Sequence, residues 1–131
     1  MIEQINKLEQ KINIKFKDQE LLKKSLIHKS HNNIINNEKL EFLGDRVLGL
    51  ILAKTLLKIY PEEKEGVIDK KFANLVNKKT CLLVAKKIEL KRYITTGNSY
   101  KGMSRSDDKI ISDGLEALLG AIYLDQGITV A

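Results

Sequence analysis

Three long segments of helical periodicity, none interrupted by proline, leave this 131-residue chain few folds other than a helical one. The longest segment runs from about Glu38 to Ile59 and precedes Pro61, the single proline of the chain, which cannot continue a helix. The same periodicity recurs from about Asp69 to Ile88 and from about Asp107 to Leu124, with Gly127 just beyond the last segment. These segments predict an all-α fold.

Two shorter helices are expected before the long ones. Apolar residues recur at helical spacing from Ile2 to Ile12, and Asp18 is a suitable N-cap for a helix from Glu20 to Ser30. Asn is frequent in residues 31–37, and Gly, Ser and Asn are frequent in residues 95–106, which predicts loops in those two places.

Composition and charge favour a polyanionic partner. Lys and Arg total 23 against 17 Asp and Glu, and the resulting net charge of +6 favours nucleic acid over a membrane. Cys81 is the single cysteine, so no internal disulfide can form, and the sequence has no Cys/His cluster typical of a zinc site. The longest uncharged apolar stretch, residues 47–53, is too short to span a bilayer, and Glu3 and Lys7 are not typical of a secretory signal. We therefore expect a cytoplasmic domain that does not bind membranes.

Acidic residues form a stripe on the longest predicted helix. At about 100° per residue, Glu38, Glu41 and Asp45 fall within an arc of roughly 60° on one face. Asp113 and Glu116 have the same three-residue spacing on the last predicted helix. Like charges on one face destabilise a helix unless a cation or a basic group offsets them. The two stripes are therefore candidates to share a cation across a contact between the helices.

Carboxylates in this pattern suit a hard divalent cation. Mg²⁺ is usually held by a few carboxylates together with water and substrate phosphate. Neither stripe contains a histidine at ligand spacing, which favours magnesium or manganese over iron or zinc. Gly49 and Gly120 continue the two stripes, and such small residues allow two helices to approach closely. The alternative is a solvated helix face, which is the usual reason for Glu-x-x-Glu spacing.

Four segments resemble blocks of the ribonuclease III catalytic domain and occur in the order found in that family. The first resembles the helix before the family signature, the second the signature itself, and the last two the blocks that follow it. They are Ser25-Leu26-Ile27-His28-Lys29-Ser30, Glu38-Lys39-Leu40-Glu41-Phe42-Leu43-Gly44-Asp45, Glu65-Gly66 with Ala73-Asn74-Leu75-Val76, and Ile111-Ser112-Asp113-Gly114-Leu115-Glu116-Ala117-Leu118-Leu119-Gly120-Ala121. The resemblance covers essentially the whole chain.

The resemblance implies an all-α ribonuclease III endonuclease-domain bundle that forms a homodimer and cuts double-stranded RNA with Mg²⁺, for which Mn²⁺ can substitute. Carried over to this sequence, the implied metal ligands are Glu41, Asp45, Asp113 and Glu116. Two of these, Asp45 and Glu116, are also implied to be catalytic. The implied supporting acids are Glu38 and Glu65. The implied reaction is phosphodiester hydrolysis by metal-activated water, which leaves 5′-phosphate and 3′-hydroxyl ends. The implied substrates are structured precursors such as ribosomal RNA, selected by A-form shape rather than base sequence.

Phe42 lies off the predicted core face, close to the acidic stripe, where an aromatic ring is costly to leave in water. The resemblance implies that its ring fills a socket in the partner subunit of a dimer. The alternative is that the ring packs under a loop of its own chain. We favour the dimer interface, since exposed aromatic residues often mark one.

Residues 1–131 are predicted to form one catalytic domain, with the start of a truncated further helix at Ile128 and no double-stranded-RNA-binding domain. Without such a domain, tight RNA binding should be lost before catalytic competence. Two other functions are weighed against the nuclease. A non-catalytic RNA-binding or assembly module of the same fold would bind RNA without cutting it, and a plain helical dimer with solvated acids would have no affinity for metal.

Overall fold

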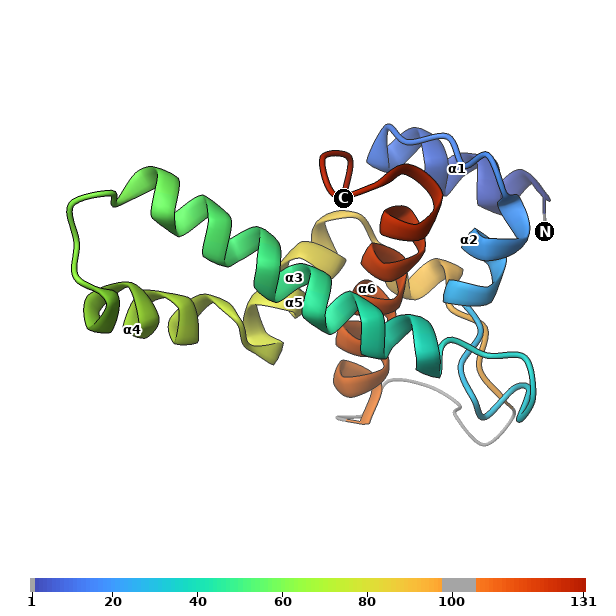
Figure 1. The fold of residues 1–131 in the computed structure, drawn as a ribbon. Coiled ribbons are helices and arrows are strands. Elements are labelled where there is room, and N and C mark those ends of the chain that lie inside the picture. Colours follow the sequence, from blue (N-terminus) through green and yellow to red (C-terminus); the bar gives the residue numbers. More distant parts are fainter. Residues whose placement is uncertain (1, 98–105) are drawn as a thin grey trace.

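The structure is a computed structural model that describes residues 2–97 and 106–131. Over these two ranges the chain forms six α-helices and a short 3₁₀ helix, which confirms the all-α prediction. In chain order they are α1 (Ile2–Ile12), α2 (Gln19–Ser25), α3 (Glu38–Ile59), α4 (Glu65–Leu75), α5 (Lys78–Lys87), η1 (Leu90–Tyr93) and α6 (Ser106–Gln126). Figure 1 shows α3 crossing α6, while the second half of α3 and the antiparallel α4 extend as a hairpin away from the other helices.

The core is built around α6, whose apolar face packs against α2, α3, α5 and η1. Two glycines set the crossing of α3 and α6. A Cβ at Gly44 would overlap the carbonyl group of Glu116, and a Cβ at Gly120 would overlap that of Leu40. Gly120 thus allows the close approach predicted for it, but the prediction for Gly49 is wrong, because Gly49 faces the ring of Phe72 on α4.

The predicted helix over residues 69–88 is wrong, because two helices occupy this part of the chain. α4 already begins at Glu65 and ends at Leu75, and α5 begins at Lys78. Between them Asn77 has an extended backbone, and its side-chain oxygen accepts a hydrogen bond from the Thr80 N–H at 2.8 Å. Asn77 is therefore the N-cap of a new helix and not an interior residue of the predicted one.

The second predicted helix ends earlier than expected. Asp18 is its N-cap, as predicted, but α2 stops at Ser25 instead of continuing to Ser30. The backbone after α2 pairs with a distant segment: Thr95 donates to the Leu26 carbonyl at 2.8 Å, and His28 donates to the Thr95 carbonyl at 2.9 Å. This tertiary pairing replaces the last helical turn. Of the predicted loop 95–106, residues 98–105 lie outside the described residues.

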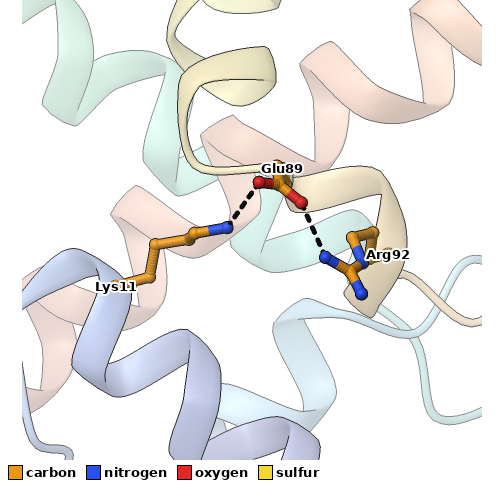
Figure 2. Close-up of polar contacts among 3 residues, drawn as sticks. All are labelled: Lys11, Glu89 and Arg92. Atoms are coloured by element: carbon orange, nitrogen blue, oxygen red, sulfur yellow. Dashed lines mark hydrogen bonds and ion pairs between the residues drawn. The ribbon is translucent and has the colours of Figure 1, made fainter.

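Charged and polar side chains tie the N-terminal helices to the rest of the domain. Glu89 follows α5, and its backbone lies in the left-handed region at φ 52°. Its carboxylate forms ion pairs with Arg92 at 2.7 Å and with Lys11 of α1 at 3.0 Å (Figure 2). These two contacts hold the pKa of Glu89 below its usual value, the hydrogen bond from Arg92 most strongly. Near the C-terminal end of α6, Asp125 accepts hydrogen bonds from the backbone N–H groups of Lys17 and Asp18, both at 2.9 Å.

After α6 the chain turns at Gly127, where φ is 89° as expected for a glycine that ends a helix. Residues 128–130 form a turn, in which the Ala131 N–H donates to the Gly127 carbonyl at 3.2 Å, and the further helix expected from Ile128 stays a prediction. None of the helices in residues 2–97 and 106–131 has the length and apolar character needed to cross a lipid bilayer.

Candidate metal centre

The crossing of α3 and α6 brings the acidic stripes of both helices together. One carboxylate oxygen from each of Glu41, Asp113 and Glu116 lies within 4.8 Å of the other two, and all three residues are half-buried. Asp45 joins this cluster through a side-chain hydrogen bond with Glu116. Glu41 is likewise hydrogen-bonded to Asp113 of α6. We call these four side chains the acid cluster.

The acid cluster borders an open cavity of about 350 Å³ between α3, α5 and α6. Three of the four carboxylates line it, and its remaining walls combine apolar, amide and basic side chains. The lining residues are Asp45, Leu48, Val76, Asn77, Lys78, Cys81, Lys109, Ser112, Asp113 and Glu116. Cys81 is buried, as expected for a small apolar residue, and burial, followed by the charges of Glu116, Asp45 and Asp113, raises its pKa to about 11. The thiol is therefore neutral at physiological pH.

Burial and mutual repulsion keep a proton on the acid cluster. The pKa of Glu116 is raised to about 8, first by burial, then by its hydrogen bond with Asp45 and by the charges of Asp45, Asp113 and Glu41. The pKa of Glu41 is also raised, mainly by burial and by the nearby Asp113. Protonation is the response of crowded, partly buried carboxylates whose charge is only partly offset by nearby basic groups. A bound divalent cation would reverse this effect and displace the proton.

Glu116 makes the stability of the metal-free domain depend on pH. The folded state holds a proton on Glu116 up to about pH 8, whereas an unfolded glutamate ionises near pH 4.5. The folded state therefore binds more protons over this range, so the free energy of unfolding falls as the pH rises. His28, whose folded pKa is lowered mainly by burial, acts in the opposite direction only below its ordinary pKa of 6.5.

We therefore expect the Tm of the wild-type domain in EDTA to be lower at pH 8 than at pH 6.5. Glu116→Gln removes the titrating group, so this decline should be smaller in that variant. Thermal unfolding of both proteins, followed by circular dichroism over this pH range, measures the difference. Equal slopes for the two proteins would contradict the raised pKa of Glu116.

Lys109 contacts the acid cluster, and this contact was not predicted from the sequence. Its Nζ lies 2.6 Å from Oδ2 of Asp113, one helical turn along α6. It also interacts electrostatically with Glu41 and Glu116. A lysine four residues from an acid on one helix is a recognised signal for an ion pair, and the search for metal ligands alone overlooked it.

The other predicted site residues lie at different distances from the acid cluster. Glu38, the first residue of α3, is exposed but close enough to Glu41 to help raise its pKa. Glu65 begins α4 and shares a separate shallow cavity with Leu57. Because Leu57 is 16 residues along α3 from Glu41, or about 24 Å, the single chain does not bring Glu65 to the cluster.

Phe42 is 63% exposed, on the same turn of α3 as the acid cluster. The guanidinium of Arg46 lies 4.0 Å from the centre of the Phe42 ring and 3.1 Å from Oδ2 of Asp45. So much exposed aromatic surface favours an interface over packing under a loop of the same chain.

The acid cluster fits a hard divalent cation. Oxygens on opposite sides of a bound Mg²⁺ are about 4 Å apart, so three carboxylate oxygens within 4.8 Å of one another need small movements to surround an ion. The three are all oxygen donors, as Mg²⁺ and Mn²⁺ prefer. Partial exposure leaves room for water and substrate oxygens in the remaining positions.

Sequence and fold together place the chain in a known class of proteins. The chain belongs to the ribonuclease-III-like family, whose sequence model matches residues 18–131. It is 63% identical over 122 residues to ribonuclease 3 of Pelagibacter ubique, covering 93% of this chain and 55% of that protein. It is 38% identical to ribonuclease 3 of Nitratiruptor sp., covering 97% of this chain and 57% of that protein. The chain therefore spans little more than half the length of these curated relatives.

Solved structures agree with this assignment. The nuclease domain of ribonuclease III from Campylobacter jejuni aligns with a TM-score of 0.87 and 38% identity, covering 95% of this chain and 88% of that one. That nuclease domain shows structural flexibility in the region involved in dimer formation. Dicer from Pichia stipitis aligns with a TM-score of 0.68 and 26% identity, covering 87% of this chain and 49% of that one. The predicted family and fold are thus confirmed.

Proposed function

We propose that this chain is the nuclease domain of an endoribonuclease that hydrolyses phosphodiester bonds of double-stranded RNA in the presence of Mg²⁺. The observation that carries this proposal is the acid cluster, in which carboxylates from two helices converge beside an open cavity. A net charge of +6 is consistent with a polyanionic substrate. Membership of the ribonuclease-III-like family supports the same reaction.

Glu41, Asp45, Asp113 and Glu116 would hold the Mg²⁺, or Mn²⁺ in its place. The bound metal supplies a nucleophile at neutral pH and stabilises negative charge on the phosphate and the leaving oxygen. Asp45 and Glu116 line the cavity, and Glu116 would give up its proton on loading of the site. Lys78, which lines the same cavity, offers a positive charge to the RNA backbone. We expect 5′-phosphate and 3′-hydroxyl ends, and structured cytoplasmic RNA such as ribosomal precursors as substrates.

The experiment that tests this function is cleavage of a long RNA duplex at low salt. The proposal expects cutting in Mg²⁺, none in EDTA, and none of a single-stranded RNA of the same sequence. RNA binding without cutting at any protein concentration would favour a non-catalytic RNA-binding module. A chimaera with a double-stranded-RNA-binding domain at the C-terminus separates that outcome from weak binding, because only a competent active site would be rescued.

We further propose that the chain forms a homodimer through the exposed apolar surface of α3 and α4. Phe42, Leu50 and Leu57 of α3 are each about 60% exposed, and Val67 and Leu75 of α4 are also exposed. None of the eleven residues of α4, all of them described, is buried. Burial against a second copy would remove this apolar surface from water.

Phe42→Ala is expected to weaken the dimer by about 30-fold, as for an aromatic residue at the centre of an interface. Sedimentation velocity over a concentration series measures the dissociation constant. Ile34→Ala is the matched control, since Ile34 is 89% exposed but lies in the loop before α3. A dimer of unchanged affinity in Phe42→Ala, or an equal loss in Ile34→Ala, would contradict the role of Phe42.

A further inference from the structure

Lys109 introduces a positive charge into the acid cluster. Its Nζ is 2.6 Å from Asp113, whose side chain is only 21% exposed, whereas the lysine side chain is 70% exposed. The residue lines the same cavity as Asp45 and Glu116. A flexible lysine thus reaches from solvent to one of the carboxylates proposed to hold the metal ion, and that carboxylate is largely shielded from solvent.

We propose that Lys109 is an internal counter-ion that competes with the divalent cation for Asp113 and so sets the metal concentration at which the centre fills. This inference rests on the proposed function, because it presupposes that the acid cluster binds metal. In the metal-free domain the ammonium offsets part of the repulsion among the four carboxylates. When a cation binds Asp113, it and the nearby ammonium repel each other, so the Lys109–Asp113 contact and metal binding weaken one another.

The geometry allows this exchange at low cost. Lys109 and Asp113 are one turn apart on α6, so the ammonium can swing towards solvent without any movement of the helix. Arg46 also pairs with the acid cluster, through Asp45. Because both of these side chains are at least half-exposed, solvent screens the pair. Lys109 is therefore the basic residue whose removal should change metal affinity most.

Titration of Mn²⁺ and Mg²⁺ into the RNA-free domain, followed by calorimetry, tests the proposal. We expect Lys109→Gln to bind metal about three- to tenfold more tightly than the wild type and to have a lower Tm in EDTA. Lys109→Arg keeps the charge and should bind like the wild type. Lys7→Gln, which removes an exposed charge from α1, is the matched control and should also bind like the wild type.

The outcomes separate this inference from the proposed function. If the wild type binds neither metal, the metal centre itself is wrong. If the wild type binds metal and Lys109→Gln binds equally or more weakly, only the competition by Lys109 is overturned. An equal gain in Lys7→Gln would also overturn it, by showing a general effect of net charge. Should Lys109→Gln fail to fold, Lys109→Met keeps the unbranched stem without the charge and carries the same expectation.

Discussion

Replacing Gly44 with alanine is expected to destabilise the domain by more than about 3 kcal/mol, a large fraction of the stability of a small domain. The added methyl group would overlap the carbonyl group of Glu116 on α6. Both sides of this contact are helical backbone, so no flexible side chain can move aside, and α3 must shift away from α6. The shift would open the core where Leu40 and Leu118 are buried.

Urea unfolding of Gly44→Ala measures this effect, with Gly66→Ala as the matched control. A methyl group at Gly66 would meet no heavy atom of another element within 4 Å in the described part of the chain. Because alanine favours helix formation over glycine, Gly66→Ala is expected to stabilise α4 by roughly 0.5 kcal/mol. A Gly44→Ala domain as stable as the wild type would show that the two helices do not cross in contact at this glycine.

The long helices and the acidic stripes could be predicted from the sequence because both follow from local periodicity. α3 has the predicted bounds, and its spacing alone puts Glu41 and Asp45 on one face. The same spacing puts Asp113 and Glu116 on one face of α6, and the structure brings the two faces together as predicted. Their roles as metal ligands stay a prediction.

The features that the sequence did not predict depend on tertiary contacts or on one side chain. Periodicity continues through Asn77, so the break between α4 and α5 is visible only from the hydrogen bond that Asn77 accepts. Likewise, α2 ends early because Leu26 pairs with Thr95, far along the chain. Which glycine contacts α6 depends on how the two helices cross. Gly44 and Gly49 are equally small, and only the packing of α3 selects Gly44.

The choice of Gly44 has a consequence for the acid cluster. This glycine lies between Glu41 and Asp45, so the point of closest approach of the two helices coincides with the α3 carboxylates. Close backbone contact buries Glu116 and brings like charges together, and both effects raise its pKa. The site therefore depends on protons, on Lys109 or on a metal to offset its charge. The packing of the core and the chemistry of the site therefore have the same cause.

Glu116→Gln is expected to lower Mg²⁺-dependent cleavage of duplex RNA by more than about 100-fold. Glutamine has the same size and keeps one oxygen, but it removes a negative charge from the centre of the acid cluster. Its amide can still donate a hydrogen bond to Asp45, so the crossing of α3 and α6 should be retained. Metal affinity should fall with the lost charge, and calorimetry with Mn²⁺ measures that effect separately from catalysis.

The control variant is Glu62→Gln, which makes the same change at an exposed glutamate in the turn between α3 and α4. It should cleave like the wild type. Because Glu116→Gln relieves repulsion within the cluster, its Tm in EDTA at pH 8 should be no lower than that of the wild type, so a loss of cleavage cannot come from unfolding. Cleavage by Glu116→Gln within about threefold of the wild-type rate would show that the acid cluster is not the nuclease centre, since removing a metal ligand costs far more than that.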